Sequence, residues 1–353
     1  MEEQATLQPK KERIEYIDAL RGFTMILVVF AHVELFGFTK AGNMSLIFQT
    51  FRMPLFFFIS GFIAYKDNLN WNFRNYLLGI IKKTKIQLIP TIFFGFIYTY
   101  FYLNKNLRDF IIDKSKLGYW FTISLLEMFF VLYTINLLSR KKINKVFILI
   151  ISSTLLYLLK TPFIHNEFLN TIGNILCLHQ TFIYFMFFAI GHIASMYKDI
   201  FLNILNNKYI SAISIVTFFS LSYITFNYDD AVWNSGLLRI YRFLQGPILG
   251  VAGIYCIYNY FRIHQDSFRS NNFIGKTLQQ IGKRTLDIYL LHYFFIPYIP
   301  QVKYIICNHK NITIEMFLGI AISLLIIIIC IVISNLIRCN SILGKYLFGA
   351  KLS

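Results

Sequence analysis

The sequence has few acidic residues and few charges of any kind. Only 17 of its 353 residues are Asp or Glu, against 34 Lys and Arg, and charged residues together make up 14% of the chain. Hydrophobic residues reach 56%, which is well above the usual share in a soluble domain. The composition therefore excludes an ordinary soluble protein and indicates a membrane protein.

Cysteine motifs, linkers and repeats are missing as well. The five cysteines are scattered, mostly in apolar surroundings, and form no CxxC pair, which argues against a cysteine-based metal site and predicts small core residues. No Pro/Ser-rich linker divides the chain, and no period of about 20 to 50 residues repeats. We therefore expect one domain without a bound metal or cofactor.

Long apolar runs are what the sequence has instead. A run of about 18 to 25 apolar residues spans the roughly 30 Å hydrocarbon core of a bilayer as a helix. Ten runs near this length occur, of which the fifth is short, at 17–37, 46–65, 86–103, 119–138, 146–160, 175–196, 209–226, 237–260, 285–304 and 312–337. They predict an all-α, polytopic integral membrane protein with about ten transmembrane helices, made of a tail at 1–13, a transmembrane domain at 14–337 and a tail at 338–353.

The net charge of +17 follows the predicted topology. If the N-terminus is cytosolic, the cytosolic segments hold 22 Lys and Arg and the opposite side holds eight. Positive residues are enriched on the cytosolic side of membrane proteins, so both termini are predicted to be cytosolic and the location to be the cell (inner) membrane. The basic composition then needs no nucleic-acid partner.

The first apolar run carries two ionisable residues, Arg21 and His32. They are eleven positions apart, which at about 100° per residue places them on one helical face, separated by about 16 Å along the axis. The intervening residues are expected on other faces; these are Met25, Ile26, Leu27, Val28, Val29 and Phe30. Intramembrane ionisable residues usually face an interior cavity, so the pair predicts a cavity that extends between them. A snorkelling Arg21 and a His32 satisfied by a neighbouring helix are the alternatives.

The second run adds FRMPLFFFISGF at 51–62. Arg52 enters from the outer side to a depth close to that of His32, so the two side chains can meet; an outward-snorkelling anchor is the alternative. Pro54 permits a kink, while Ser60 and Gly61 permit a close helix contact.

These stretches resemble a known family. YIDALRGFTMILVVFAH followed by FRMPLFFFISGF is similar to the membrane-bound acyltransferase 3 family, and the segments at 118–130, 185–195 and 281–295 are similar to its later blocks, in the same order. The resemblance implies a membrane O-acyltransferase that takes an acyl group, most often acetyl from acetyl-CoA, to a hydroxyl of a surface glycan, lipid or related acceptor. The sequence departs from the family at KKTKIQLIP, 82–90, which has lysines where members commonly have arginines.

Catalytic roles can be assigned within that hypothesis. A histidine can take the proton of the acceptor hydroxyl or carry the acyl group, and His32 is the candidate for either role, with Arg21 and Arg52 beside it. Glu127 is expected at a similar depth and would hold the imidazole in the required tautomer. Alternatively, Glu127 is a buried acid paired with Arg52 or Arg242.

Binding roles follow from charge and spacing. Lys82, Lys83 and Lys85 would attract the donor phosphates as point charges. Tyr289 and His292 share a helical face and either line the donor channel or form a packing pair.

The acceptor side offers a second pair. Arg239 and Arg242 either grip the acceptor or anchor a helix at the interface. The predicted partners are acyl-CoA as donor substrate, a glycan or lipid-linked acceptor, and membrane lipids. A transporter or flippase for a glycan or lipid precursor is the main alternative; a scaffold without catalysis is another.

Overall fold

The structure, a computed structural model, describes residues 14–39, 43–66, 71–227, 236–302 and 312–349. Within these ranges every regular element is helical and no strand occurs. The longer helices are α1 (Glu15–His32), α2 (Asn43–Ala64), α3 (Phe73–Ile97), α5 (Trp120–Leu138), α6 (Lys142–His165), α8 (Leu178–Met196), α10 (Lys208–Asn227), α11 (Gly236–Ile263) and α15 (Ile312–Cys339).

Shorter elements connect or extend these helices. The short α-helices are α4 (Leu107–Ile112), α7 (Glu167–Leu176), α9 (Lys198–Asn206), α12 (Phe273–Lys283), α13 (Thr285–Leu291) and α16 (Ser341–Phe348). The π- and 3₁₀-turns are η1 (Val33–Gly37), η2 (Tyr98–Tyr102), η3 (Lys116–Gly118), η5 (Gln265–Phe268) and η6 (His292–Phe295).

The all-helical, multi-pass architecture agrees with the prediction, but the count of ten spans is not confirmed. Among the described residues, seven helices are long and apolar enough to cross a membrane, and α7 with α8, bent by 63°, would make eight. The predicted runs at 86–103 and 285–304 give no such helix. The cytosolic orientation of the termini remains a prediction. The predicted tail at 1–13 lies outside the described residues, whereas much of the one at 338–353 is the helix α16.

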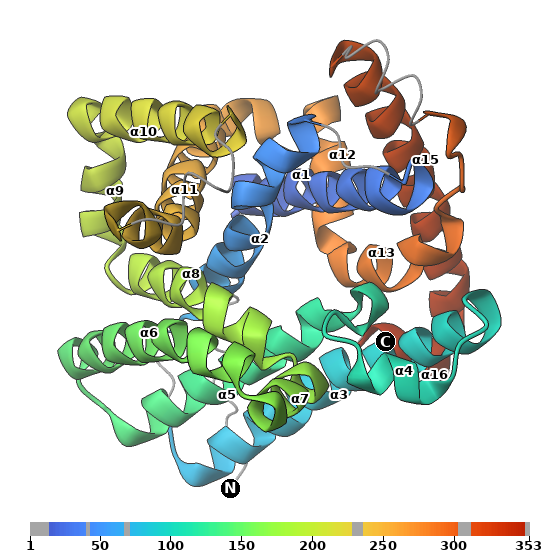
Figure 1. Ribbon diagram of the computed structural model, residues 1–353, viewed down its shortest axis with the longest axis horizontal. Helices are drawn as coiled ribbons and strands as arrows, with labels where there is room; N and C mark the ends of the chain where they lie inside the picture. The colour runs from blue at the N-terminus through green and yellow to red at the C-terminus, as the bar shows by residue number, and fades with distance from the viewer. Residues whose placement is uncertain (1–13, 40–42, 67–70, 228–235, 303–311, 350–353) are drawn as a thin grey trace, which may run out of the picture.

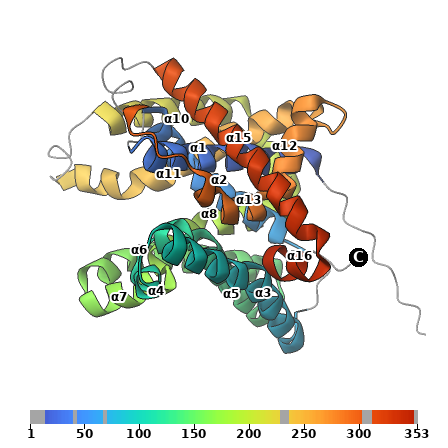
Figure 2. The ribbon, with the colours of Figure 1, turned by 90° about the vertical axis from the view of Figure 1, so that its right-hand side faces the viewer.

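Helices α9, α10 and α11 gather on one side of α2 and α8, and two further groups of helices lie around this pair (Figure 1). One group contains α3, α5, α6 and α7; the other contains α1, α12, α13 and α15, and Figure 2 shows the same division from the side. The closest packing is between α2 and α8 and between α1 and α12. The space between the two groups is where α1, α3, α5 and α13 face one another.

Glycines make the two closest helix contacts possible. A Cβ on Gly22 of α1 would lie 2.0 Å from the carbonyl oxygen of Leu278, and one on Gly282 of α12 would lie 1.9 Å from that of Asp18. Gly61 of α2 packs in the same way, with its Cβ position 1.9 Å from the Phe188 carbonyl oxygen. The close approach predicted at Gly61 is thus confirmed, and small residues at such crossings are typical of membrane helices.

The predicted ninth helix is interrupted, which corrects the sequence-based expectation for 285–304. The α-helix α13 ends at Leu291 and continues as the turn η6, after which residues 296–299 form no regular element. The Ile299 amide donates to the Gly37 carbonyl at 2.8 Å, so this irregular backbone is satisfied inside the protein, as buried backbone at membrane depth requires.

A charged network attaches α13 to α15. Asp287 is 2% exposed, lies 3.3 Å from Arg284 and 2.9 Å from Arg338 of α15, and accepts a further hydrogen bond from Ser334. Because a buried carboxylate is costly without partners, these contacts explain why α13 stays attached to α15 although it is only seven residues long.

Candidate active site

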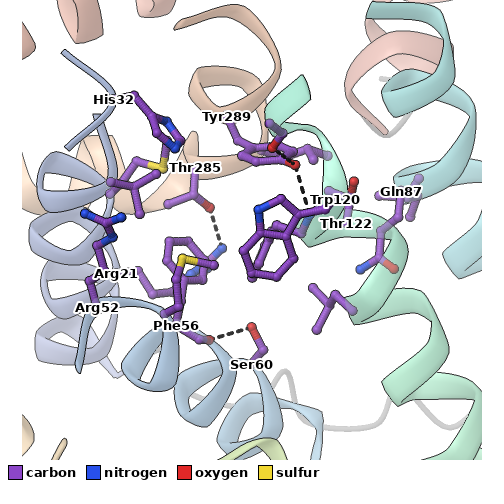
Figure 3. A pocket seen from close by; sticks show the side chains of 18 residues that line it. Arg21, His32, Arg52, Phe56, Ser60, Gln87, Trp120, Thr122, Thr285 and Tyr289 are labelled. Atoms are coloured by element: carbon purple, nitrogen blue, oxygen red, sulfur yellow. Dashed lines mark hydrogen bonds between the residues drawn. The ribbon is translucent and has the colours of Figure 1, made fainter. Parts of the chain in front are cut away.

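A cavity of about 200 Å³ lies between the two groups of helices (Figure 3). Its walls come from α1, α2, α3, α5 and α13 together with the end of η3. The lining residues are Arg21, Met25, Val28, His32, Arg52, Met53, Phe56, Ser60, Ile86, Gln87, Gly118, Trp120, Phe121, Thr122, Leu125, Thr285, Leu286 and Tyr289. None of them is acidic, and Arg21 and Arg52 bring two guanidinium groups to the wall.

Helix α1 contributes one continuous stripe to this wall. Arg21, Met25, Val28 and His32 follow at steps of four, three and four residues, which is the spacing of a single helical face. The cavity therefore contains both Arg21 and His32, as their shared face predicted. The expectation that Met25 and Val28 lie on other faces is wrong, because the same stripe includes them.

Arg21 is oriented by protein contacts. Its Nη2 donates to Thr285 Oγ1 at 2.9 Å, and its Nη1 lies 3.7 Å from Asp18. The side chain is 27% exposed. Thr285 is the first residue of α13, so the guanidinium is hydrogen-bonded to the helix that faces α1 across the cavity.

Two polar groups in the cavity wall lack protein partners. Arg52 Nη1 is buried and has no hydrogen-bond partner among the described residues. The same holds for Oε1 of Gln87, a residue that is only 7% exposed. Unpaired buried polar groups cost free energy, and both residues line the cavity. A polar or anionic ligand in the cavity would satisfy them.

His32 lies at the far end of the stripe from Arg21 and is held by a second histidine. Its Nδ1 is 2.8 Å from His292 Nε2, and His292 Nδ1 is 2.9 Å from the Ile288 carbonyl oxygen. The Tyr293 hydroxyl lies 3.4 Å from His32 Nε2. His32 is half-buried and faces the cavity, whereas His292 is fully buried behind it.

Near this end of the cavity, two tyrosine hydroxyls donate to the same backbone carbonyl. The hydroxyls of Tyr289 and Tyr293 each donate to the Gly118 carbonyl at 3.1 Å, and that of Tyr289 accepts from the Phe121 amide at 3.1 Å. Gly118 has φ +110°, and a Cβ there would lie 2.2 Å from the Tyr293 hydroxyl. Only glycine suits this position.

A buried lysine supports the loop that carries Gly118. Lys116 is 2% exposed, and its Nζ donates to the carbonyls of Ile111, Asp113 and Asn174. Burial lowers the pKa of this ammonium group, while nearby Cys177, Asp113 and Glu127 partly offset the effect. The three carbonyls replace the water that an exposed ammonium would bind, so the loop is fixed in place.

Several predicted site residues do not reach the cavity. Glu127 accepts from Thr181 of α8, and the imidazole of His32 is held by His292 instead; the expected Glu127–His32 contact is therefore wrong. Tyr289 lines the cavity, whereas His292 does not, and a donor-binding role for Tyr289 stays a prediction.

The charged residues proposed for binding also lie outside the wall. Lys82 and Lys85 are exposed, and Lys83 Nζ sits 3.5 Å from the centre of the Phe129 ring. Arg242 is exposed on α11 and does not line the cavity. The side chain of Arg239 lies outside the described residues.

Three residues of the site were not predicted from the sequence: Gln87, Thr285 and Tyr293. Gln87 had a signal, since it is a polar residue inside an apolar run and lies one helical turn after Lys83. Thr285 and Tyr293 had none, because their importance comes from contacts with Arg21 and His32 more than 250 positions away. Among the described residues no group of His, Cys, Asp or Glu is arranged to hold a metal ion.

The comparisons with known proteins agree with the resemblance of the motifs. The sequence profile described as an acyltransferase domain matches residues 14–336, nearly the whole chain. The chain has no match among the curated proteins or among the solved structures. The profile match is enough to decide the family: the chain belongs to the acyltransferase 3 family and is a multi-pass membrane protein of the acyltransferase type.

Proposed function

We propose that this protein is an O-acyltransferase of the cell (inner) membrane. It takes an acyl group, acetyl being the first candidate, from cytosolic acyl-CoA and delivers it to a hydroxyl of a surface glycan or a lipid-linked precursor. The proposal rests mainly on one observation: the same cavity is lined by Arg21 at one end and by His32 at the other. A guanidinium and an imidazole so placed suit a donor that has phosphates at one end and a thioester at the other.

The donor would enter at the Arg21 end. Arg21 and the nearby lysines Lys82, Lys83 and Lys85 supply positive charge for the nucleotide phosphates, although none of the lysines lines the cavity. The pantetheine arm contains amides, and the unpaired Oε1 of Gln87 is a suitable acceptor for one of their N–H groups. The mostly apolar wall would cover the rest of the arm.

The acyl transfer would take place at the His32 end. His32 takes the proton of the acceptor hydroxyl as that oxygen bonds to the thioester carbon, and the C–S bond then breaks. Arg52 would stabilise the negative oxygen that forms on the way, which gives its unpaired Nη1 a partner. An acyl-histidine route would use the same imidazole as nucleophile. Arg239 and Arg242 would act only on parts of the acceptor outside the cavity.

Purified protein in liposomes tests the proposal directly. We expect radiolabel from acetyl-CoA supplied on one side to appear on the hydroxyls of an added glycan acceptor, and no transfer from free acetate. Movement of an unlabelled lipid-linked glycan across the bilayer without acylation would instead show the transporter or flippase. Binding of acetyl-CoA without transfer to any of a panel of glycan acceptors would contradict the enzymatic function.

Arg21→Ala should weaken donor use in a way that depends on the donor's phosphates. We expect KM for acetyl-CoA to rise by roughly tenfold, about the effect of one lost charge-assisted contact. Acetyl-pantetheine, which has the thioester arm without the nucleotide, should be used equally by wild type and variant. An equal loss with both donors would contradict a phosphate role for Arg21 and indicate a local structural effect, such as the lost hydrogen bond to Thr285.

A further inference from the structure

His292 touches neither the cavity nor solvent. It is 0% exposed, and its ring lies nearly parallel to that of His32, with 5.0 Å between the ring centres and 11° between the planes. Because it is absent from the cavity wall, it cannot contact a donor or an acceptor there. Any effect of His292 on the reaction must therefore pass through His32.

When both rings are neutral, only one assignment of donors and acceptors satisfies the hydrogen bonds of His32 and His292. The Ile288 carbonyl can only accept, so His292 Nδ1 carries a hydrogen and donates it over 2.9 Å. A neutral imidazole has one N–H, so His292 Nε2 is left with a lone pair. His32 Nδ1, 2.8 Å away, must then be the donor, and His32 Nε2 keeps its own lone pair.

Tyr293 does not occupy the lone pair on His32 Nε2. Its hydroxyl has one hydrogen and two acceptors in reach, the Gly118 carbonyl at 3.1 Å and His32 Nε2 at 3.4 Å. The shorter contact and the carbonyl acceptor favour Gly118. His32 Nε2 is therefore the nitrogen that can receive a proton.

We propose that His292 is a positioning residue: it holds His32 as the tautomer with hydrogen on Nδ1, so that Nε2 is the base in acyl transfer. The inference rests on the proposed function and adds a residue to it. The carbonyl of Ile288, at the last turn of α13, fixes the tautomer of the whole pair. A neutral histidine thus does what a carboxylate does for the histidine of a catalytic triad, without a negative charge at membrane depth.

The transfer step balances with this pair. The acceptor O–H gives its proton to His32 Nε2 while its oxygen bonds to the thioester carbon and the carbonyl electron pair moves to oxygen. The tetrahedral intermediate collapses, the C–S bond breaks, and the leaving thiolate takes the proton from Nε2. Throughout, His32 Nδ1–H stays bonded to His292 Nε2, which stabilises the imidazolium form because a hydrogen bond from a charged donor is stronger than a neutral one.

Two substitutions at the same position separate positioning from packing. His292→Leu removes the acceptor of the Nδ1 hydrogen and keeps an apolar side chain, whereas His292→Gln can present an amide oxygen to it. We expect His292→Leu to lower kcat by about 10²-fold or more, as loss of tautomer control does elsewhere, with KM for acetyl-CoA nearly unchanged. His292→Gln should recover at least about tenfold of the lost kcat.

A matched control comes from another buried histidine. His192 on α8 is 2% exposed and lies outside the cavity wall, so His192→Leu should leave kcat and KM as in wild type. A kcat for His292→Leu equal to that of His192→Leu would overturn the inference. If wild type transfers label and His32→Ala does not, the proposed function survives that result; if wild type itself transfers no label, the proposed function fails.

A spectroscopic measurement covers the case in which His292→Leu does not fold. In wild-type protein labelled with ¹⁵N in the histidine rings, the signals of His32 can be assigned by their loss in His32→Gln. We expect a protonated Nδ1 and an unprotonated Nε2 for the neutral ring. The opposite tautomer would overturn the inference whatever the variants show.

Discussion

His32→Ala is expected to abolish acyl transfer while leaving the protein folded. General base catalysis by a positioned histidine contributes roughly 10² to 10⁴ in rate, and His32 Nε2 is the base in the proposed step. The lost side chain faces the cavity and is half-buried, so the packing cost should be small. The measurement is kcat for label transfer from acetyl-CoA, together with the midpoint of thermal unfolding in detergent.

The folded state of this variant decides how the result is interpreted. An unfolding midpoint close to that of wild type, with kcat lower by at least about 10²-fold, assigns the loss to chemistry. Turnover within a few-fold of wild type would remove His32 from the mechanism. Acetyl-CoA binding should persist in His32→Ala, because the groups proposed for the phosphates and the arm are unchanged.

Gly22→Val is expected to prevent correct folding. A Cβ at this position would lie 2.0 Å from the Leu278 carbonyl oxygen and 3.1 Å from the Gly282 amide nitrogen, and backbone atoms cannot move aside as a flexible side chain can. Separating α1 from α12 would cost more than the roughly 1 to 3 kcal/mol of ordinary overpacking. Size-exclusion chromatography should show aggregation or greatly reduced yield, and any remaining protein should unfold at a lower temperature.

The chain offers a matched control for this steric argument. Gly246, also within a helix, has no atom of the described residues within 4 Å of its Cβ position, so Gly246→Ala should be neutral or slightly stabilising, since alanine has the higher helix propensity. Equal behaviour of Gly22→Val and Gly246→Ala would show that α1 and α12 do not meet as closely as described.

Periodicity predicted the part of the site that a single helix builds. Arg21 and His32 face one cavity because eleven residues make close to three turns, and that arithmetic needs no knowledge of neighbouring helices. The same arithmetic, applied to every position between them, would also have placed Met25 and Val28 on the stripe.

Contacts between helices could not be predicted from the sequence, as Glu127 illustrates. Its depth in the membrane follows from its place in the apolar run, but depth does not give direction. Leu125 lines the cavity, and two further residues turn the helix by about 200°, which points Glu127 toward Thr181 of α8. Apolar composition alone gave no indication of which face of α5 would meet α1.

The sequence contains a feature that predicts the end of α13, although the apolar character of the run led us to expect a continuous helix. Residues 285–304 are hydrophobic enough for a transmembrane helix, but Pro297 and Pro300 follow closely after Leu291, where the α-helix ends. Proline removes a backbone donor and disfavours the helical conformation of the residue before it. Weighing these two residues against hydropathy would have predicted a helix end near the observed one.

The convergence of Tyr289 and Tyr293 on the Gly118 carbonyl restricts how the cavity can be reached. Lifting the loop that carries Gly118 would break both hydrogen bonds at once, together with the three that anchor Lys116. That loop is therefore a fixed part of the cavity wall, and we do not expect it to open. For the proposed acyl transfer, we therefore expect the acceptor to reach His32 by a path that does not pass through this loop.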